Sequence, residues 1–362
     1  MPVEPENQNA APDEQSAQSR RAARDAATAS KEKAKRRGPR IVLWTFVALI
    51  VAVAAVAGTY VWRLTNAYGQ ADTLASDDLF PEREDRPDPV QPADPKDGDE
   101  EAINILLLGS DTRAQISEDE ALEDISGQRS DTIMVVNIPA DRESVNVMSI
   151  MRDNWVPIPG HGHNKINAAL AFGGPRLLIQ TIEDILDVPI DHVALIDFEG
   201  FKGLTDALGG VTVNNSTAFT AGGRSFAEGE ITLNGEDALT FVRERYAFAD
   251  GDYQRVRNQQ AYMAGLLNQV LSRDTLTSPG KILDSVDAIS PFLTVDDGLS
   301  STYLVSLGLS MRDLRSADVT MFTSPTNGTG MVGAASVVHP DWRGLEELST
   351  LFKEDRVADW SD

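Results

Sequence analysis

The sequence predicts an α/β protein, specifically a three-layer α-β-α sandwich with a mixed central sheet. Apolar runs of strand length alternate with helical patterns over most of residues 103–273. INILLLG (103–109) is apolar along its whole length, which is typical of a strand buried on both faces. TIMVVNI (132–138) and VNVMSIM (145–151) flank the turn-like segment PADRES and predict an antiparallel hairpin. Since crossover helices and a hairpin both connect strands, we expect a mixed sheet covered by helices.

Further strands and helices follow in alternation. Paired glycines after LTDAL and a proline at position 175 mark where helices end or begin. The predicted helices cover residues 165–172, 176–187, 198–210, 234–245 and 254–272. The predicted strands are 193–198, 211–214 and 318–324. Residues 276–355 add two or three helices, and we expect them to complete the same domain, which would span residues 102–355.

Residues 41–62 form an uncharged apolar segment that is long enough to cross a hydrocarbon core of about 30 Å as a helix. Aromatic residues lie near both of its ends, as in transmembrane helices. A buried core helix is rarely uncharged on every face for this length. A cleaved signal peptide has a shorter apolar region of about 7–15 residues, although Ala55-Val56-Ala57 inside the segment resembles a cleavage site. We therefore expect a retained single transmembrane helix.

Flanking charge predicts the orientation of this helix. KEKAKRRGPR (31–40) is strongly basic, whereas only Arg63 follows closely on the other side. The positive-inside rule then places residues 1–40, which we expect to be disordered, in the cytoplasm. The expected localisation is the cell membrane, crossed once, with the folded domain extracellular.

Overall composition excludes several classes of function. The formal net charge of -24 makes nucleic-acid binding unfavourable. The chain has no cysteine, which excludes disulfides, thiolate catalysis and cysteine-based zinc sites. Residues 63–101 are rich in Asp, Glu and Pro and predict an extended acidic linker between membrane and domain. A solvated charge run without a specific role explains that composition equally well.

Five short clusters of arginine and aspartate mark the ends of predicted strands and helices. A guanidinium group matches phosphate oxygens, and a carboxylate matches a hard divalent cation. The clusters therefore predict a site for a phosphorylated ligand associated with a metal ion. They contain Asp111 and Arg113, Arg129 and Asp131, Arg152 and Asp153, Arg243 and Arg245, and Asp252, Arg255 and Arg257.

The positions of the first three clusters constrain the site. Asp111 follows the first buried strand, and ligands commonly lie beyond the carboxyl ends of strands in α/β sheets. Asp131 precedes one strand of the predicted hairpin, and Arg152 follows the other. We expect these two motifs at opposite ends of the hairpin, unless the long acidic loop 115–128 folds back.

The last two clusters lie on predicted helices. Arg243 and Arg245 are two residues apart near a helix end and should point to different sides. Arg255 and Gln259 are four residues apart and share a helix face. Asp252 precedes that helix, where it either belongs to the site or simply complements the helix dipole.

The segment HGHNKINAALAFGG (161–174) offers weaker candidates. His161 and His163 are two residues apart in a loop, but a third metal ligand is not evident in the sequence. Lys165 and Asn167 are better placed as polar contacts at a helix start. The sequence contains no Walker loop, GxGxxG, HExxH or nucleophile elbow.

The ordered motifs resemble the LytR–CpsA–Psr family of cell-wall phosphotransferases. After the basic-flanked apolar segment come NILLLGSDTR, RSDTIMVV, SIMRD, KINAALAFGG, LNGEDALTFVRERY and DYQRVRNQQ, in that order. The resemblance covers about residues 103–273. It implies transfer of an anionic glycopolymer from a polyprenyl-pyrophosphate carrier to a muramic-acid hydroxyl of peptidoglycan, with magnesium as cofactor.

The resemblance also implies roles for individual residues. Asp111 and Asp131 match the aspartates that coordinate Mg²⁺, and Asp111 or Asp153 is a candidate for deprotonating the acceptor hydroxyl. The implied catalytic residues are Asp111, Arg152, Asp153 and Arg243. The implied pyrophosphate-binding residues are Arg113, Arg129, Arg152, Arg243, Arg245, Asp252, Arg255 and Gln259. An apolar groove between the sheet and the helices would hold the lipid chain.

Two departures from the family pattern are visible. The acidic loop 115–128 is longer than usual and could shield the pocket. Asn258 stands where the family has an arginine, and Arg257 is displaced by one position, about 100° around the helix. We therefore expect Arg257 to lie outside the site.

Two other functions are compatible with the same clusters. A lipid pyrophosphatase would use them to hydrolyse polyprenyl pyrophosphate. A non-catalytic regulatory protein would use them to hold a lipid-linked precursor without turnover.

Overall fold

The computed structural model describes residues 58–90, 100–110, 130, 132–248, 250–270, 272 and 278–361. Internal contacts divide the chain into two units, residues 1–62 and 63–362. The predicted cytoplasmic tail and most of the predicted transmembrane segment lie outside the described residues. No helix in the described part of the chain has the length and apolar character needed to cross a bilayer.

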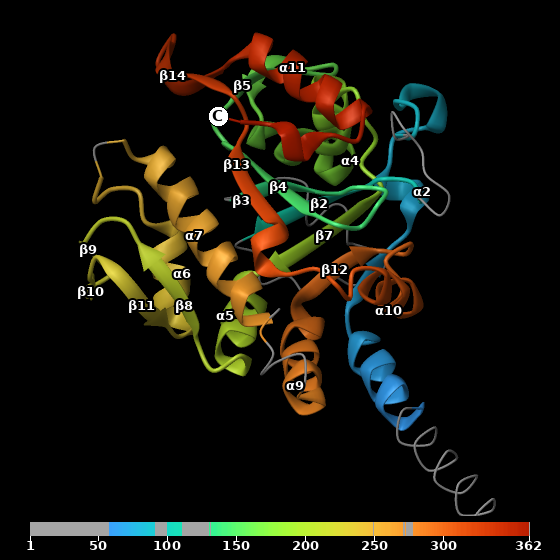
Figure 1. Ribbon diagram of the computed structural model, residues 1–362. Helices are drawn as coiled ribbons and strands as arrows, with labels where there is room; N and C mark the ends of the chain where they lie inside the picture. Colours follow the sequence, from blue (N-terminus) through green and yellow to red (C-terminus); the bar gives the residue numbers. More distant parts are fainter. Residues whose placement is uncertain are drawn as a thin grey trace, which may run out of the picture. The chain divides into compact units, whose positions relative to one another are not determined.

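A mixed sheet of seven strands forms the middle of the second unit, as predicted (Figure 1). Its strands are, from one edge to the other, β1 (Asp72–Leu74), β12 (Leu293–Asp296), β7 (His192–Asp197), β2 (Ile103–Ser110), β3 (Thr132–Ile138), β4 (Val145–Ile150) and β13 (Val319–Thr323). β1 and β12, β7 and β2, and β4 and β13 pair in parallel, whereas the other neighbours are antiparallel.

Helices cover both faces of this sheet. The helices are α2 (Ser76–Leu79), α4 (Asn167–Leu186), α5 (Phe198–Ala207), α6 (Gly235–Arg243), α7 (Asp252–Val270), α9 (Pro279–Ile289), α10 (Ser301–Ser310) and α11 (Trp342–Lys353). Single 3-10 turns occur at Arg83–Asp85, Ser290–Phe292, Ser316–Asp318 and Val357–Asp359. The helices predicted at 165–172 and 176–187 form one element, α4, with a kink at Gly173 and Gly174.

The alternation of side chains along the strands explains the three layers. Leu106 and Leu108 of β2 pack with α4 and α11 in one apolar cluster. Ile103 packs on the other face with Leu307 of α10, and Met263 of α7 borders that cluster. Successive side chains of a strand point to opposite faces, so a continuously apolar strand is buried between two helical layers. The predicted three-layer arrangement is therefore observed.

Residues 72–90, predicted as part of an extended linker, belong instead to the folded domain. Asp72–Leu74 pair with β12, and Leu79, Phe80 and Val90 are buried in the cluster beneath α4. The linker was predicted from the high content of Asp, Glu and Pro, and the few apolar residues in this segment did not change that prediction. The domain therefore begins before residue 102, the start that we expected.

The expected position of the hairpin motifs is also wrong. In an antiparallel pair the start of one strand lies opposite the end of its partner, and here Ile133 of β3 pairs with Ile150 of β4. Gly109 of β2 pairs with both Thr132 of β3 and Ile196 of β7. The start of β3 and the carboxyl ends of β2, β4 and β7 thus meet at one edge, called the functional edge below. The carboxyl end of β13 joins them through its pairing with β4.

Small sheets are added around this frame. They are formed by β5 (Trp155–Ile158) with β6 (Gly162–Lys165), β8 (Val211–Asn215) with β11 (Gly229–Leu233), β9 (Phe219–Ala221) with β10 (Arg224–Phe226), and β14 (Thr326–Val332) with β15 (Ala335–Pro340). β8 packs directly on α7 at Gly265, where a Cβ would lie 2.3 Å from the carbonyl oxygen of Thr212. Only glycine allows this close approach of helix and strand.

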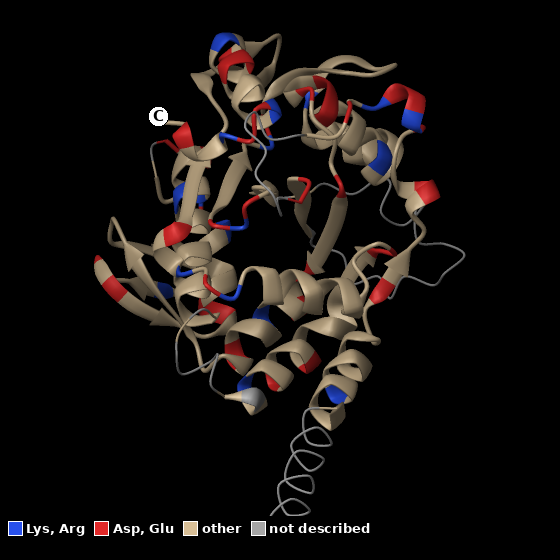
Figure 2. Cartoon of the chain, turned by 45° about the vertical axis from the view of Figure 1, so that its right-hand side comes forward, with Lys and Arg blue, Asp and Glu red and all other residues tan. Residues whose placement is uncertain are grey.

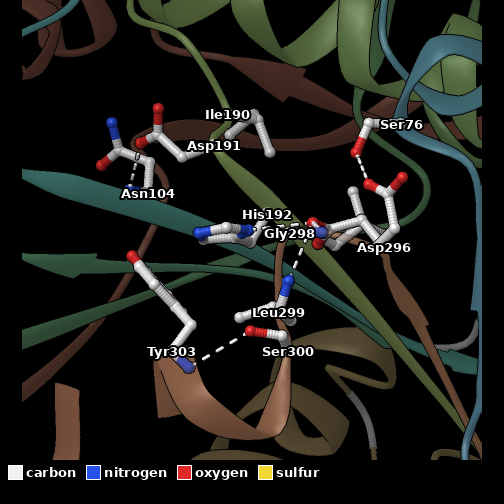
Figure 3. A network of polar contacts seen from close by, with 12 residues as sticks. Ser76, Asn104, Ile190, Asp191, His192, Asp296, Gly298, Leu299, Ser300 and Tyr303 are labelled. Atoms are coloured by element: carbon white, nitrogen blue, oxygen red, sulfur yellow. Dashed lines mark hydrogen bonds and ion pairs between the residues drawn. The ribbon is translucent and has the colours of Figure 1, made fainter. Parts of the chain in front are cut away.

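The opposite edge of the sheet carries a separate polar network (Figure 3). The buried Asp296 carboxylate accepts hydrogen bonds from the backbone N–H groups of Val193 and Gly298 and lies 3.0 Å from Nδ1 of His192. Asp191 accepts the N–H of Asn104 at 2.8 Å. These contacts join the amino ends of β7 and β2 to the loop after β12.

Burial of the Asp191 carboxyl raises its pKa from 3.8 to about 6. The folded state therefore binds this proton more tightly than the unfolded chain, and the resulting stabilisation is lost as the pH rises from about 4 through 6. We expect the free energy of unfolding of the wild type, relative to Asp191→Asn, to fall by roughly 2–3 kcal/mol between pH 4 and pH 7. Urea unfolding across this range measures the difference, and a difference that stays constant with pH would contradict the assignment.

Candidate functional site

Arg152 and Asp153 lie at the functional edge, directly after β4. Oδ1 of Asp153 is 3.8 Å from Nε of Arg152, and its Oδ2 is 3.2 Å from Nζ of Lys165 at the end of β6. All three side chains are mostly buried. The β5–β6 hairpin thus returns a lysine to the segment that follows β4, and Asp153 lies between two cationic groups.

A second charged group is formed where α6 ends and α7 begins. Asp252, the first residue of α7, lies 3.1 Å from Nη1 of Arg255 and 3.7 Å from Nη1 of Arg245. The side chain of Arg255 is only 4 % exposed. Asp153 also acts electrostatically on Arg245, which connects this group to Arg152 and Lys165. The structure therefore gathers arginines from three separate motifs at one place.

Arg243 and Arg245 contact different elements, as expected. Arg243 is the last residue of α6, and its guanidinium lies 4.4 Å above the ring of Phe198, where β7 meets α5. Arg245 follows the helix end, and its guanidinium donates to the hydroxyl of Tyr246 and stacks on that ring. Cation–π contact holds a guanidinium flat while its N–H groups remain able to bind an anion.

A small apolar cluster fixes the relative positions of these charged segments. Met151 precedes Arg152 and packs with Val256 of α7 and Val338 of β15, and Tyr253 borders the same cluster. The N–H of Val338 also donates to the carbonyl oxygen of Asp153 at 2.9 Å. Close packing leaves little freedom for such a cluster to rearrange. The charged groups on β4 and α7 are therefore held in a fixed geometry.

An apolar cavity of about 220 Å³ opens between the sheet and the helices beside this site. Its walls come from β2, β3, β7, α5, α6 and α7 and include Leu107, Ala194, Leu239 and Met263. Arg243 and Gln259 lie at its border. Buried Gln259 donates its amide to the carbonyl oxygen of Val242 at 3.4 Å, which ties α7 to α6. The predicted apolar groove therefore has a counterpart that ends at Arg243.

Of the predicted residues, Arg152, Asp153, Arg245, Asp252 and Arg255 form the two charged groups, and Arg243 and Gln259 line the adjoining cavity. The remaining four, Asp111, Arg113, Arg129 and Asp131, lie outside the described residues. Within the described ranges, the Asp, Glu and His side chains do not form a group of three that could hold a metal ion. Asp252 both begins its helix and pairs with site arginines, so the two roles considered for it coexist.

Arg257 lies apart from the group, in agreement with its expected direction. Its side chain is 49 % exposed, and it pairs with Asp250 and donates to Gln254. Arg255, two positions earlier on the same helix, is buried beside Asp252. The two arginines therefore form a matched pair, one inside the site and one outside it.

Sequence reasoning missed two contributors to the site. Lys165 was expected only as a polar contact at a helix start, whereas it pairs with Asp153. Phe198 was not singled out, although an aromatic residue immediately after a buried strand at the functional edge is a usable signal. The charges of the described chain are mixed, and Figure 2 shows basic ribbon segments interspersed with acidic ones. This distribution does not favour nucleic-acid binding.

The buried position of Arg255 predicts a strong contribution to anion binding. Arg255→Gln should lower the affinity for inorganic pyrophosphate at least about tenfold, because a charge-assisted contact in a desolvated site contributes more than an exposed one. Isothermal titration calorimetry measures this affinity. Arg257→Gln is the matched control and should leave it unchanged. Equal losses in the two variants would show that general charge, and not this site, governs binding.

The chain is similar to bacterial proteins whose names refer to cell-wall synthesis. The cell wall biosynthesis protein LcpA of Corynebacterium glutamicum is 33 % identical over 305 residues, which cover 73 % of this chain and 57 % of LcpA. The polyisoprenyl-teichoic acid–peptidoglycan teichoic acid transferase TagU of Halalkalibacterium halodurans is 40 % identical over 52 % of this chain and 59 % of TagU. The chain thus spans less than two thirds of each of these relatives.

Solved structures share the fold. The crystal structure of TagV from B. subtilis has a TM-score of 0.59 at 26 % identity, covering 72 % of this chain and 98 % of TagV. A family model for the LytR_cpsA_psr family matches residues 69–354. This match begins inside the segment that composition alone assigned to a linker, in agreement with the folded residues 72–90. The chain therefore belongs to the LytR_cpsA_psr family.

Proposed function

We propose that this protein is a membrane-anchored phosphotransferase that moves a glycopolymer from a polyprenyl-pyrophosphate carrier onto peptidoglycan. The observation that carries the proposal is the convergence of Arg152, Arg243, Arg245 and Arg255 beside an apolar cavity. A lipid pyrophosphate has the matching chemistry, an anionic head joined to an apolar chain. The name of the relative TagU, a teichoic acid transferase, supports the same class of reaction.

The reaction is a single displacement at phosphorus. An oxygen of a peptidoglycan hydroxyl forms a bond to the phosphorus that carries the glycopolymer. The bond between that phosphorus and the bridging oxygen breaks, and polyprenyl monophosphate leaves with the electron pair. The hydroxyl proton passes to a carboxylate, for which Asp111 and Asp153 are the candidates. The arginines neutralise the negative charge that develops on the phosphoryl and leaving oxygens.

Magnesium is the proposed cofactor, with Asp111 and Asp131 as its ligands. In the sequence, Asp111 follows Ser110 and Asp131 precedes Thr132. Ser110 pairs with Asp197, and Thr132 pairs with Gly109, so both neighbours belong to the functional edge. Carboxylate oxygens are the ligands that Mg²⁺ accepts, and one or two of them commonly hold it beside phosphates. Bound there, the ion would supply positive charge to the pyrophosphate oxygens. Asp153 and Asp252 already pair with cationic side chains and are less suited to this role.

The expected extracellular localisation follows from the basic segment 31–40 before the apolar segment 41–62. A lipid-linked substrate stays in the membrane, so an anchored enzyme meets it without diffusing through the wall. The chain has no cysteine of its own, so labelling of a single cysteine introduced on the surface of the domain, in intact cells and with a membrane-impermeant reagent, would test the extracellular position.

Removal of an arginine should abolish transfer while the fold is retained. We expect Arg152→Ala and Arg243→Ala each to lower the rate of polymer transfer at least about 10²-fold, because loss of one preorganised donor to a developing anion commonly costs that much. The assay follows labelled polymer from a synthetic lipid-linked donor to peptidoglycan. Thermal unfolding of both variants should remain close to the wild type, and Arg257→Ala should retain full transfer.

The same assay separates the two alternative functions. A lipid pyrophosphatase would release polyprenyl phosphate at the same rate with or without peptidoglycan. A non-catalytic binding protein would hold the lipid donor without turnover when Mg²⁺ and acceptor are both supplied. Either result, or full transfer by both alanine variants, would overturn the proposal.

The apolar cavity should hold the first part of the prenyl chain. Ala194→Leu places a larger side chain into the cavity from β7. The extra side chain occupies space that the lipid needs, so the KM for a long-chain polyprenyl donor should rise about tenfold. A donor with a ten-carbon chain should be affected much less. If the variant and the wild type have the same KM for both donors, the prenyl chain does not bind in this cavity.

A further inference from the structure

A second pocket lies at the start of α7, whose later turns line the apolar cavity. It has a volume of about 560 Å³ and is bounded by the start of α7, the end of β13, the start of β14, α11 and the C-terminal residues. In Figure 1 these elements meet near the label of the C-terminus. Its lining includes Tyr253, Ser324, Thr326, Asp341, Glu347 and Trp360.

Side chains of this pocket are bonded to the segments that carry the arginine site. Tyr253 directly follows Asp252, and its hydroxyl lies 2.8 Å from Oγ1 of Thr326. The amide of Asn154, the residue after Asp153, donates to Oγ of Ser324 at 3.4 Å. The pocket therefore shares a wall with the site.

Helix α7 links the three regions in a definite order. Tyr253 lines the second pocket, Arg255 lies in the arginine site, and Gln259 and Met263 line the apolar cavity. Tyr253 and Met263 are ten residues apart on this helix, which corresponds to about 15 Å along its axis. An in-line displacement needs the attacking oxygen on the side of phosphorus opposite to the leaving group. With the lipid in the apolar cavity, that opposite side faces the second pocket.

The chemistry of the pocket fits a saccharide. Trp360 and Tyr253 provide aromatic surfaces, and hydroxyl and charged groups surround them. Sugars present C–H faces and hydroxyl groups at once, so they need this mixture of apolar and hydrogen-bonding surface. A lipid chain does not fit so polar a lining. An anion does not fit either, because Asp341 and Glu347 oppose it and Arg343 lies 3.2 Å from Glu347.

We infer that this pocket binds the glycan strand of the acceptor and presents its hydroxyl to the arginine site. The inference rests on the proposed function and adds the place of the acceptor to it. The sugars of the donor polymer are the other possible source of the same chemistry. The donor sugars are carried by the phosphorus that is attacked in the arginine site. Binding of the free donor polymer is therefore compared with binding of a peptidoglycan fragment.

Two variants test the pocket without touching the arginines. Trp360→Ala removes an aromatic face, and Glu347→Gln removes a surface charge that has no contact with the core. We expect Trp360→Ala to raise the KM for a defined peptidoglycan tetrasaccharide at least tenfold and Glu347→Gln to raise it about threefold to tenfold. The KM for the lipid donor and the affinity for inorganic pyrophosphate should stay unchanged. Trp342→Ala is the control. Trp342 lies on α11 with Glu347, is 47 % exposed and does not line the pocket.

Direct binding completes the experiment. The lipid-free wild type should bind the tetrasaccharide in a calorimetric titration, and Trp360→Ala should weaken this binding at least tenfold. An acceptor KM that is unaltered in Trp360→Ala and Glu347→Gln would overturn the inference while leaving the transferase intact. Tighter binding of the free donor polymer than of the tetrasaccharide would overturn the acceptor assignment. Binding at Trp360 without any transfer would instead support the pocket and refute the proposed function.

Discussion

The register of the central sheet is the constraint on which the site depends. The pairing of Ile133 with Ile150 and of Gly109 with Thr132 and Ile196 brings the ends of four strands to one edge. Residues as much as 87 positions apart in the sequence, such as Gly109 and Ile196, thereby become neighbours. A shift of one residue in the β3–β4 register would turn the side chains of the shifted strand to the wrong helical layer. The same burial that stabilises the sheet therefore also fixes the site.

Continuous apolar strands were the part of the fold that sequence patterns predicted best. The range 132–138 coincides with β3, and 103–109 with β2 except for its last residue. Short polar strands such as β6 and β14 carry no comparable pattern, because they pair in small sheets with one side in solvent. β1 has three residues and pairs with β12 more than two hundred positions later, so local sequence gives no sign of it.

The site residues show the same division between local pattern and tertiary contact. Arginine clusters at the ends of elements were sufficient to select Arg152, Arg243 and Arg255. The contact of Arg243 with Phe198 depends on the packing of α6 against α5, which sequence spacing does not reveal. The expectation for the hairpin failed for a geometric reason, since the open end of an antiparallel hairpin holds both the first and the last residues. Spacing along a chain thus identifies candidates, and strand direction decides which of them meet.

Acidic residues within the arginine clusters have a role that differs from metal binding. The guanidinium groups of Arg245 and Arg255 lie around one carboxylate and repel each other before any ligand arrives, and burial of Arg255 adds a desolvation cost. Asp252 lies within 4 Å of both groups, and Asp153 lies close to Arg152 and Lys165. These carboxylates offset the repulsion and hold the guanidinium forks in one orientation. An anionic ligand would then meet donors that are already arranged, so a strongly acidic protein can still offer a site for an anion.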